Sequence, residues 1–354
     1  MRITRFLILA VLMTSGGERE LVDPVGFPTN KQQAEAVIKY AKKRSDEMTR
    51  EENIPHSPML SAICPHDDHI YAGPLYIPIM KRIHASHLIL IGVFHKAWKW
   101  DARDVLIFDD FQTWKGPLGS VPVDVPFRSA VLDQLPGNDF LVNRKYHEVE
   151  HSLEAFLAFI QYFSPEAAIL PILVPYMKWE TMDRLALDLS RSVAKVMEKN
   201  GWKWGGDVQI LISNDSVHYG DQGWAGKNYA PFGTGVEGLS RAKNRDLTII
   251  RQHLLGIIEP EELRKMLYAL VNEEDVTQYE ITWCGRFSVP FGVDFSYHLS
   301  RSLNQPVPRG FFLGYGTSVE MGELPVRDIG LGVTAPANLH HWVAYSAIGY
   351  FTPQ

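Results

Sequence analysis

The sequence has little cysteine and no long apolar run. Only Cys64 and Cys284 occur among its 354 residues, which excludes a disulfide framework and leaves each thiol free to act as a ligand or to fill the core. No segment is long and apolar enough to cross a bilayer, so we expect no stable membrane insertion. The net charge is −6 and no basic stripe is present, which argues against nucleic acid as a partner.

Several catalytic motifs are also missing. No Gly-x-Gly-x-x-Gly follows a predicted strand, and there is no Walker loop or Gly-x-Ser-x-Gly elbow. Nucleotide-dependent enzymes and serine hydrolases depend on such motifs for phosphate binding and nucleophile activation. The sequence therefore lacks the defining parts of both classes.

The N-terminus allows two interpretations. Arg2 and Arg5 precede a short apolar run over residues 6–13, and small residues follow it, as in a secretory signal peptide. The alternative is an N-terminal extension. Residues 1–18 are therefore either a signal peptide, which would make the protein exported or periplasmic, or an extension of a cytoplasmic protein. Because no linker, repeat or low-complexity tract follows, we expect residues 19–354 to form a single domain.

Apolar runs of strand length alternate with amphipathic helical patterns. This alternation predicts an α/β fold, a three-layer α/β/α sandwich around a central, largely parallel mixed sheet. We place the last two strands at the far edge of the sheet, and residues 220–238 in a long loop that could cover a site. The predicted strands are 59–64, 88–94, 103–108, 168–174, 207–213, 310–317 and 342–351, and the predicted helices are 30–48, 74–85, 150–163, 181–199, 239–255 and 260–271.

Three of the predicted strands run directly into loops that carry metal-ligand residue types. In an open α/β sheet the carboxyl ends of the strands share one edge, where ligands bind. Imidazole and carboxylate groups meeting there would suit iron, manganese or zinc. The residues concerned are His66, Asp67, Asp68 and His69 after the first strand, His95 after the second, and Asp215 and His218 after the third.

These residues have less specific interpretations as well. The aspartates could cap a turn, and His95 could be a hydrogen-bonded core group. We rank His66 ahead of His69 as a ligand. Asp215 could orient an imidazole or bind metal itself, and His218 could bind metal or act as a general base.

Two further segments carry candidate residues. Cys284 is followed by a glycine, which permits close backbone approach, and by Arg286, which would favour the thiolate; a lone cysteine is more often a buried apolar group. Glu150, His151 and Glu154 are predicted to open a helix, where the helix dipole favours carboxylates. His151 would there be a neutral imidazole that supports the site or faces the substrate.

Taken in order, short motifs along the chain resemble the Memo family, also named AmmeMemoRadiSam system protein B. They span about residue 20 to the C-terminus. The matching pieces are Val22-Asp23-Pro24-Val25-Gly26-Phe27-Pro28, Pro65-His66 through Tyr71-Ala72-Gly73, Gly92-Val93-Phe94-His95, Glu150-His151-Ser152-Leu153-Glu154, Leu170-Pro171-Ile172-Leu173-Val174, Ser213-Asn214-Asp215-Ser216-Val217-His218-Tyr219-Gly220, Cys284-Gly285-Arg286 and Val343-Ala344-Tyr345-Ser346-Ala347-Ile348-Gly349-Tyr350.

The resemblance implies a fold similar to the catalytic subunit of class III extradiol dioxygenases. It also implies that His66, His95 and Cys284 hold iron or copper, with His218 and Asp215 beside them. Where the family usually continues Pro-His with Ala-Gly, this chain has Asp67 and Asp68. Either carboxylate could then complete a site of two histidines and one carboxylate.

From these observations we expect a mononuclear non-haem iron oxidoreductase. Fe(II) is the preferred metal, copper the second choice and zinc the third. The catalytic residues would be His218, His151 and Asp215. The substrate would be a small molecule whose identity the sequence does not give, with aromatic compounds as one candidate class. The alternatives are a non-catalytic metal- or peptide-binding protein and a metal-dependent hydrolase. Association with radical-SAM partners is implied by the resemblance alone.

Overall fold

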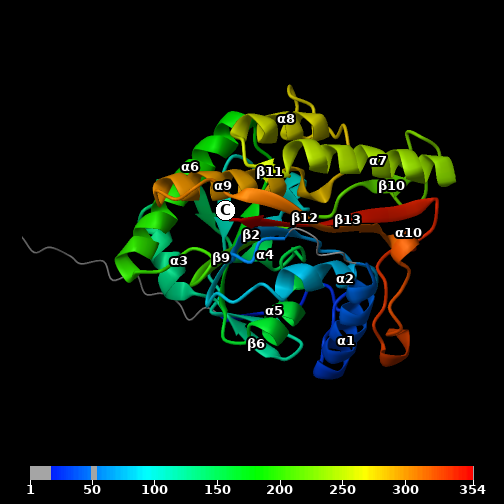
Figure 1. Ribbon diagram of the computed structural model, residues 1–354, viewed down its shortest axis with the longest axis horizontal. Coiled ribbons are helices and arrows are strands. Elements are labelled where there is room, and N and C mark those ends of the chain that lie inside the picture. Colours follow the sequence, from blue (N-terminus) through cyan, green and yellow to red (C-terminus); the bar gives the residue numbers. More distant parts are fainter. Residues whose placement is uncertain (1–16, 49–53, 354) are drawn as a thin grey trace, which may run out of the picture.

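A ten-stranded mixed sheet forms the centre of the computed structural model, which describes residues 17–48 and 54–353 (Figure 1). Of the signal peptide or extension predicted over residues 1–18, residues 1–16 lie outside the described residues, and Glu18 belongs to a short strand. In spatial order the strands are β11 (Gly256–Ile257), β12 (Arg309–Thr317), β13 (His341–Phe351), β2 (Met59–Cys64), β9 (Val208–Ser213), β3 (His87–Val93), β8 (Ala168–Val174), β4 (Leu106–Phe108) and β7 (Phe140–Val142), and β10 (His218–Gly220) pairs with β13.

The four strands β2, β9, β3 and β8 are parallel to one another, and β12, β13 and β11 continue the sheet antiparallel. The parallel strands are apolar because helices cover both of their faces. A separate three-stranded sheet contacts β8 of the main sheet through β6. It consists of β1 (Glu18–Arg19), β5 (Thr113–Gly116) and β6 (Gly119–Pro122).

Helices cover both faces of the main sheet, as the α/β prediction required (Figure 1). On one face α2 (His69–Met80) contacts β12, β13 and β2, with α1 (Lys31–Met48) and α5 (Leu157–Phe163) beside it. On the other face α9 (Ser288–Ser302) contacts β2, β3, β8 and β9. The remaining helices are α3 (Val125–Leu132), α4 (Arg144–His147), α6 (Trp179–Asn200), α7 (Val236–His253), α8 (Pro260–Leu270) and α10 (Ser318–Met321), and short 3-10 turns lie at Ala97–Lys99, Glu154–Phe156, Cys284–Arg286 and Arg327–Ile329.

The helix predicted over residues 74–85 begins five residues earlier, at His69. Pro74 therefore lies inside α2 instead of in its first turn. A proline in that position leaves the carbonyl of Ile70 without its helical donor. The backbone N–H of Leu324 donates to this carbonyl at 2.8 Å, so tertiary contact replaces the missing bond.

One further expectation about the elements is wrong, and one helix was missed. β13 does not lie at the sheet edge but pairs with both β12 and β2, and all eleven of its residues are buried. α9 was not predicted, because Pro290 and Gly292 weaken the helical pattern. A Cβ at Gly292 would lie 2.6 Å from Ile212, so glycine is required there for the helix to pack closely on β9.

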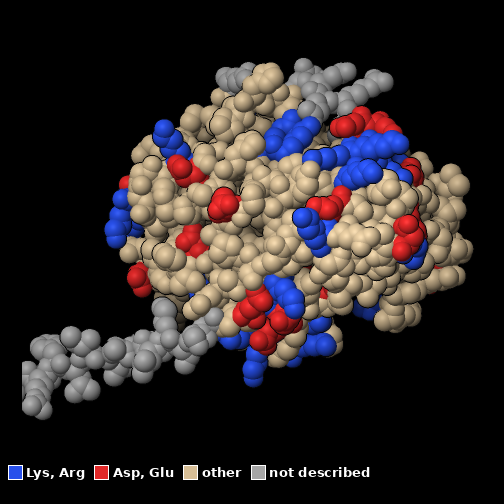
Figure 2. Space-filling model, turned by 90° about the horizontal axis from the view of Figure 1, so that it is seen from below, with Lys and Arg blue, Asp and Glu red and all other residues tan. Residues whose placement is uncertain are grey.

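Among the described residues, no helix is both long and apolar enough to cross a bilayer. Basic and acidic side chains are interspersed on the face drawn in Figure 2. The buried apolar side chains of the sheet and of the helices on its two faces form one core cluster.

A buried ion pair fastens the N-terminal segment to the core. The Arg19 guanidinium lies 2.8 Å from the Glu154 carboxylate, both side chains are fully buried, and Arg19 also donates to the carbonyl of His147. Removing one partner of a buried pair leaves the other charge without compensation.

We expect Arg19→Ala to lower the free energy of unfolding by about 3–5 kcal/mol, because the Glu154 carboxylate stays buried. Urea unfolding followed by circular dichroism measures this change. Lys31→Ala is the control, since Lys31 and Glu35 form an exposed pair that contributes less than about 1 kcal/mol. Equal effects of the two substitutions would show that the buried pair does not stabilise the fold.

Candidate metal centre

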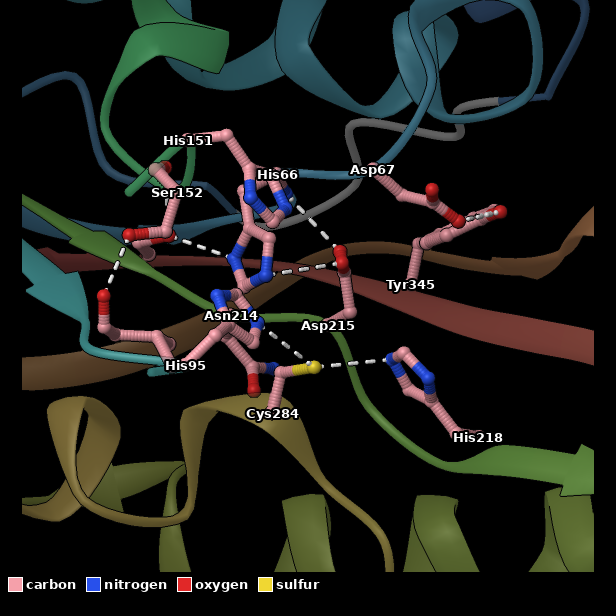
Figure 3. A network of polar contacts seen from close by, with 12 residues as sticks. His66, Asp67, His95, His151, Ser152, Asn214, Asp215, His218, Cys284 and Tyr345 are labelled. Carbon is pink, nitrogen blue, oxygen red and sulfur yellow. Dashed lines mark hydrogen bonds and ion pairs between the residues drawn. The ribbon is translucent and has the colours of Figure 1, made fainter. Parts of the chain in front are cut away.

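The parallel register of the sheet brings the three loops together. Cys64 is paired with Ser213, and the neighbouring β3 is aligned with β9. His66, Asp215 and His95 each follow two residues after the end of β2, β9 and β3. Strands in register that end at one edge place these side chains around one point, as Figure 3 shows.

The Cys284 loop reaches the same point from a different part of the chain. The backbone N–H of Cys284 donates to the carbonyl of Asp215 at 3.0 Å. A Cβ at Gly285 would lie 2.2 Å from the Asn214 side-chain oxygen, so only glycine allows this approach. The buried Asp246 of α7 accepts from the Trp283 indole and from the backbone N–H of Val217, which joins the two loops.

His66, His95 and Cys284 each present one ligand atom to a common space, with all three atoms within 4.8 Å of one another. Cys284 Sγ lies 3.3 Å from His95 Nε2 and 3.1 Å from His218 Nε2. Asp215, His218 and Cys284 form a second such group. The side chains around this space are shown in Figure 3.

The tautomer of His66 follows from its hydrogen-bond partners. The Ser213 hydroxyl has one hydrogen and donates it to the Ser152 carbonyl at 2.9 Å. It must then accept from His66 Nδ1, 2.7 Å away. Burial lowers the pKa of His66 and so favours the neutral ring, in which Nε2 is then unprotonated. This buried atom has no hydrogen-bond partner. Asp215 Oδ2 is 3.2 Å from it, a contact without hydrogen-bond geometry. An orphaned imidazole nitrogen beside a thiol and a second imidazole is what a transition metal requires.

The buried Glu150 carboxylate fixes His95. Its two oxygens accept from the His95 backbone N–H at 2.7 Å and from His95 Nδ1 at 2.8 Å. They also accept from the backbone N–H groups of His151 and Ser152, each at 2.9 Å. A carboxylate bonded to one ring nitrogen leaves the other free to face a metal.

These contacts correct the helix predicted over residues 150–163. The chain turns at Glu150 and His151, and the helical backbone begins only at Glu154 with a 3-10 turn. The Glu150 side chain satisfies the amides that follow it, so its carboxylate supports the site and does not complement a helix dipole.

The electrostatics of the site favour a thiolate. Burial raises the pKa of the Cys284 thiol, but the adjacent His218 and His95 outweigh burial and hold that pKa well below its usual range. Burial lowers the pKa of His95, and Glu150 and Cys284 outweigh it, so the pKa of His95 is raised. Burial lowers the pKa of His66, and burial together with His95 lowers the pKa of His151 to about 3.

A cavity of about 410 Å³ opens onto these ligand atoms. It is lined by histidines, aromatic side chains and a few charged groups. His151 lies on its wall, with its ring stacked on His95 at a centroid distance of 4.7 Å. The lining residues are His66, Asp67, His95, His151, Asp215, His218, Gly223, Trp224, Tyr229, Tyr279, Thr282, Trp283, Cys284, Arg286, Thr334, Ala335, His341 and Val343.

The aspartates after His66 are placed differently from each other. Asp67 lines the cavity and accepts from the Tyr345 hydroxyl at 2.6 Å. Asp68 does not line it, since its carboxylate accepts from the backbone N–H and the hydroxyl of Thr334. His69 points into the core, where its Nε2 lies 2.8 Å from the Ala155 carbonyl oxygen.

The sequence interpretation missed three residues that position this site. Ser213 sets the tautomer of His66, Tyr345 binds Asp67, and Asp246 joins two loops. Ser213 carried a signal, because it is a polar residue at the end of an otherwise apolar strand. Asp246 and Tyr345 carried none, since they lie in a helix and a strand remote in sequence.

The family model described as Memo-like protein matches residues 26–323. The chain belongs to the Memo-like protein family. A MEMO1 family protein of Methanosarcina barkeri is 31% identical over 172 residues, which are 48% of this chain and 57% of the relative. The chain thus spans little more than half of that relative's length. A MEMO1 family protein of Pyrococcus horikoshii is 24% identical over 277 residues, covering 76% of this chain and 84% of the relative. The predicted family is confirmed.

We expect Glu150→Gln to weaken binding of a divalent transition metal by about 10- to 100-fold. The glutamine amide has one acceptor oxygen where the carboxylate has two, and it lacks the negative charge that makes the His95 imidazole a stronger ligand. Competition with a chromophoric chelator measures the affinity. Glu148→Gln is the control, since Glu148 is exposed two residues away. Unchanged affinity in Glu150→Gln would mean that His95 needs no carboxylate partner.

Proposed function

We propose that this Memo-like protein is a metal-dependent oxidoreductase that acts on a small aromatic substrate. His66, His95 and Cys284 would hold a single non-haem iron, with copper as the second choice. The observation that carries the proposal is the convergence of His66 Nε2, which has no hydrogen-bond partner, with His95 Nε2 and Cys284 Sγ. When bound, the metal would supply one-electron chemistry toward dioxygen and substrate.

The chain's own residues would bind and orient the substrate. Trp224, Tyr229 and Tyr279 line the cavity and can pack against an aromatic ring. Arg286 also lines it, is 9% exposed, and has no carboxylate partner among residues 17–48 and 54–353. Its guanidinium donates to the Trp283 carbonyl and the Tyr279 hydroxyl. An acidic group on the substrate would supply the missing counter-charge.

His151 is the better placed of the two proton acceptors expected from the sequence. His218 Nε2 is engaged with Cys284 Sγ at 3.1 Å. In the part of the chain that the structure describes, neither ring nitrogen of His151 has a hydrogen-bond partner, and the carboxylate nearest to its Nδ1 is 3.7 Å away. A neutral imidazole on the cavity wall can accept a proton from a substrate hydroxyl. Asp215 would keep the His66 loop in place through the His66 backbone N–H.

A second candidate function is non-catalytic metal binding. The proximity of Asp215 and His218 to Cys284 favours it, because five donors could fill every coordination position and leave none for substrate. Radical-SAM partners remain an implication of the resemblance, and a zinc-dependent hydrolase is an outcome of the experiment below.

Metal content after anaerobic purification tests the proposal. We expect stoichiometric iron or copper in the wild type and almost none in His66→Ala, because that variant removes one of the three proposed ligands. His340→Ala is the control, since His340 is exposed and does not line the cavity. Metal retained at full occupancy in His66→Ala would contradict the proposed ligand set.

Oxygen consumption with catechols then separates the functions. Turnover by the iron-loaded wild type supports the oxidoreductase. Full zinc occupancy with hydrolytic turnover would favour the hydrolase, and a loaded protein inert toward oxygen and esters would favour the binding protein.

We expect His151→Asn to keep its metal and to lose about 10²- to 10⁴-fold in turnover, because proton transfer from the substrate becomes unassisted. Steady-state oxygen uptake gives kcat and KM separately. A raised KM with kcat unchanged would instead assign His151 to substrate binding.

A further inference from the structure

Outside the candidate metal centre, a further group of ligand-type side chains lies between two helices that the proposed function does not use. Asp294 and His298 are four residues apart on α9, and Asp183 is on the adjacent α6. One ligand atom from each lies within 4.8 Å of the others. Positions i and i+4 share a helix face, so α9 presents a carboxylate and an imidazole together toward α6.

The arrangement of this group is open on one side. His298 Nε2 lies 2.9 Å from Asp183 Oδ1 and 3.7 Å from Asp294 Oδ1. The Asp183 side chain is 42% exposed, whereas the Asp294 side chain is fully buried. A small ion could therefore enter from solvent past Asp183 and keep water on its outer side.

Asp294 is the observation that distinguishes this cluster from an ordinary surface ion pair. Both of its carboxylate oxygens are buried and neither has a hydrogen-bond partner. Among the described residues, no lysine or arginine pairs with it. A buried carboxyl group without partners is costly unless it is neutralised. His298 cannot do so alone, because its Nε2 is closer to Asp183.

We propose that Asp183, Asp294 and His298 form a second divalent-cation site, distinct from the His66 centre, which takes a Zn²⁺-like ion. Two carboxylates and one imidazole are a ligand set that zinc accepts, with water in the remaining position. A bound cation would satisfy the orphaned Asp294 oxygens and cross-link α6 to α9. Because α9 packs on β2, β3, β8 and β9, such a cross-link would stabilise the layer that supports the sheet.

The site goes beyond the proposed function and does not depend on it. The chain that tests it is the full-length protein carrying His66→Ala and Cys284→Ser, stripped of metal. These substitutions remove two donors of the first centre, and Zn²⁺ binding that is then lost in Asp294→Asn or His298→Gln reports the second. If the first centre proves not to bind metal, the test of the second is unaffected.

In that background we expect one Zn²⁺ ion to bind, with affinity lowered at least about 100-fold by Asp294→Asn or by His298→Gln. Competition with a chromophoric chelator gives the stoichiometry and affinity. Asp188→Asn is the control, because Asp188 lies on α6, the helix that carries Asp183, and its side chain pairs only with Arg184 and Arg191 among the described residues. It should leave Zn²⁺ binding unchanged.

Folding is checked separately from binding. Asn is nearly isosteric with Asp and removes the need to neutralise a buried carboxyl group, so metal-free Asp294→Asn should melt no lower than its parent. Zn²⁺ should raise the melting temperature of the parent and leave that of Asp294→Asn unchanged. Equal Zn²⁺ affinity and equal thermal shifts in the two proteins would overturn the proposal, as would a crystal soaked in Co²⁺ without anomalous density between α6 and α9.

Discussion

The candidate site depends on one buried carboxylate. Glu150 accepts four N–H groups, from the backbone and ring of His95 and from the amides of His151 and Ser152. Burial raises the pKa of a carboxyl group, but His95 and the amides outweigh burial and lower the pKa of Glu150. A fully satisfied buried network restricts its members to one geometry. The end of β3 and the turn at residues 150–152 are consequently held as one unit.

Backbone carbonyl groups of Glu150 and Ser152 connect this unit to two other parts of the chain. The Ser152 carbonyl accepts from Ser213, which in turn sets the protonation of His66. On the other side, the Arg19 guanidinium donates to the Glu150 carbonyl. The atoms that face the cavity are therefore oriented by partners that do not line it. Because the ligand side chains are already held in place, binding a metal would cost them little conformational entropy.

Much of the fold could be predicted from the sequence. Strands such as β2 and β8 were recognised within one residue, because continuous apolar runs of this length suit strands covered on both faces. The helix predicted over residues 30–48 matches α1, and the Asn30 side chain in front of it accepts from the Gln33 N–H. α2 and α9 resisted prediction because prolines and glycines inside them are compensated by contacts with distant residues, Leu324 and Ile212. The predicted position of β13 at the sheet edge was wrong because local sequence patterns do not determine the order of strands in a sheet.

The sequence by itself determined which residue types stand at the strand ends, because apolar runs that stop at His66, His95 and Asp215 are local patterns. The motif order along the chain also sufficed to identify the family. Only the tertiary structure decided that Asp67 faces the cavity while Asp68 binds Thr334, that Ser213 frees His66 Nε2, and that Glu150 supports a ligand instead of a helix. Side-chain direction and protonation depend on partners that are 55 to 266 residues away along the chain, and those partners meet only when the sheet register is formed.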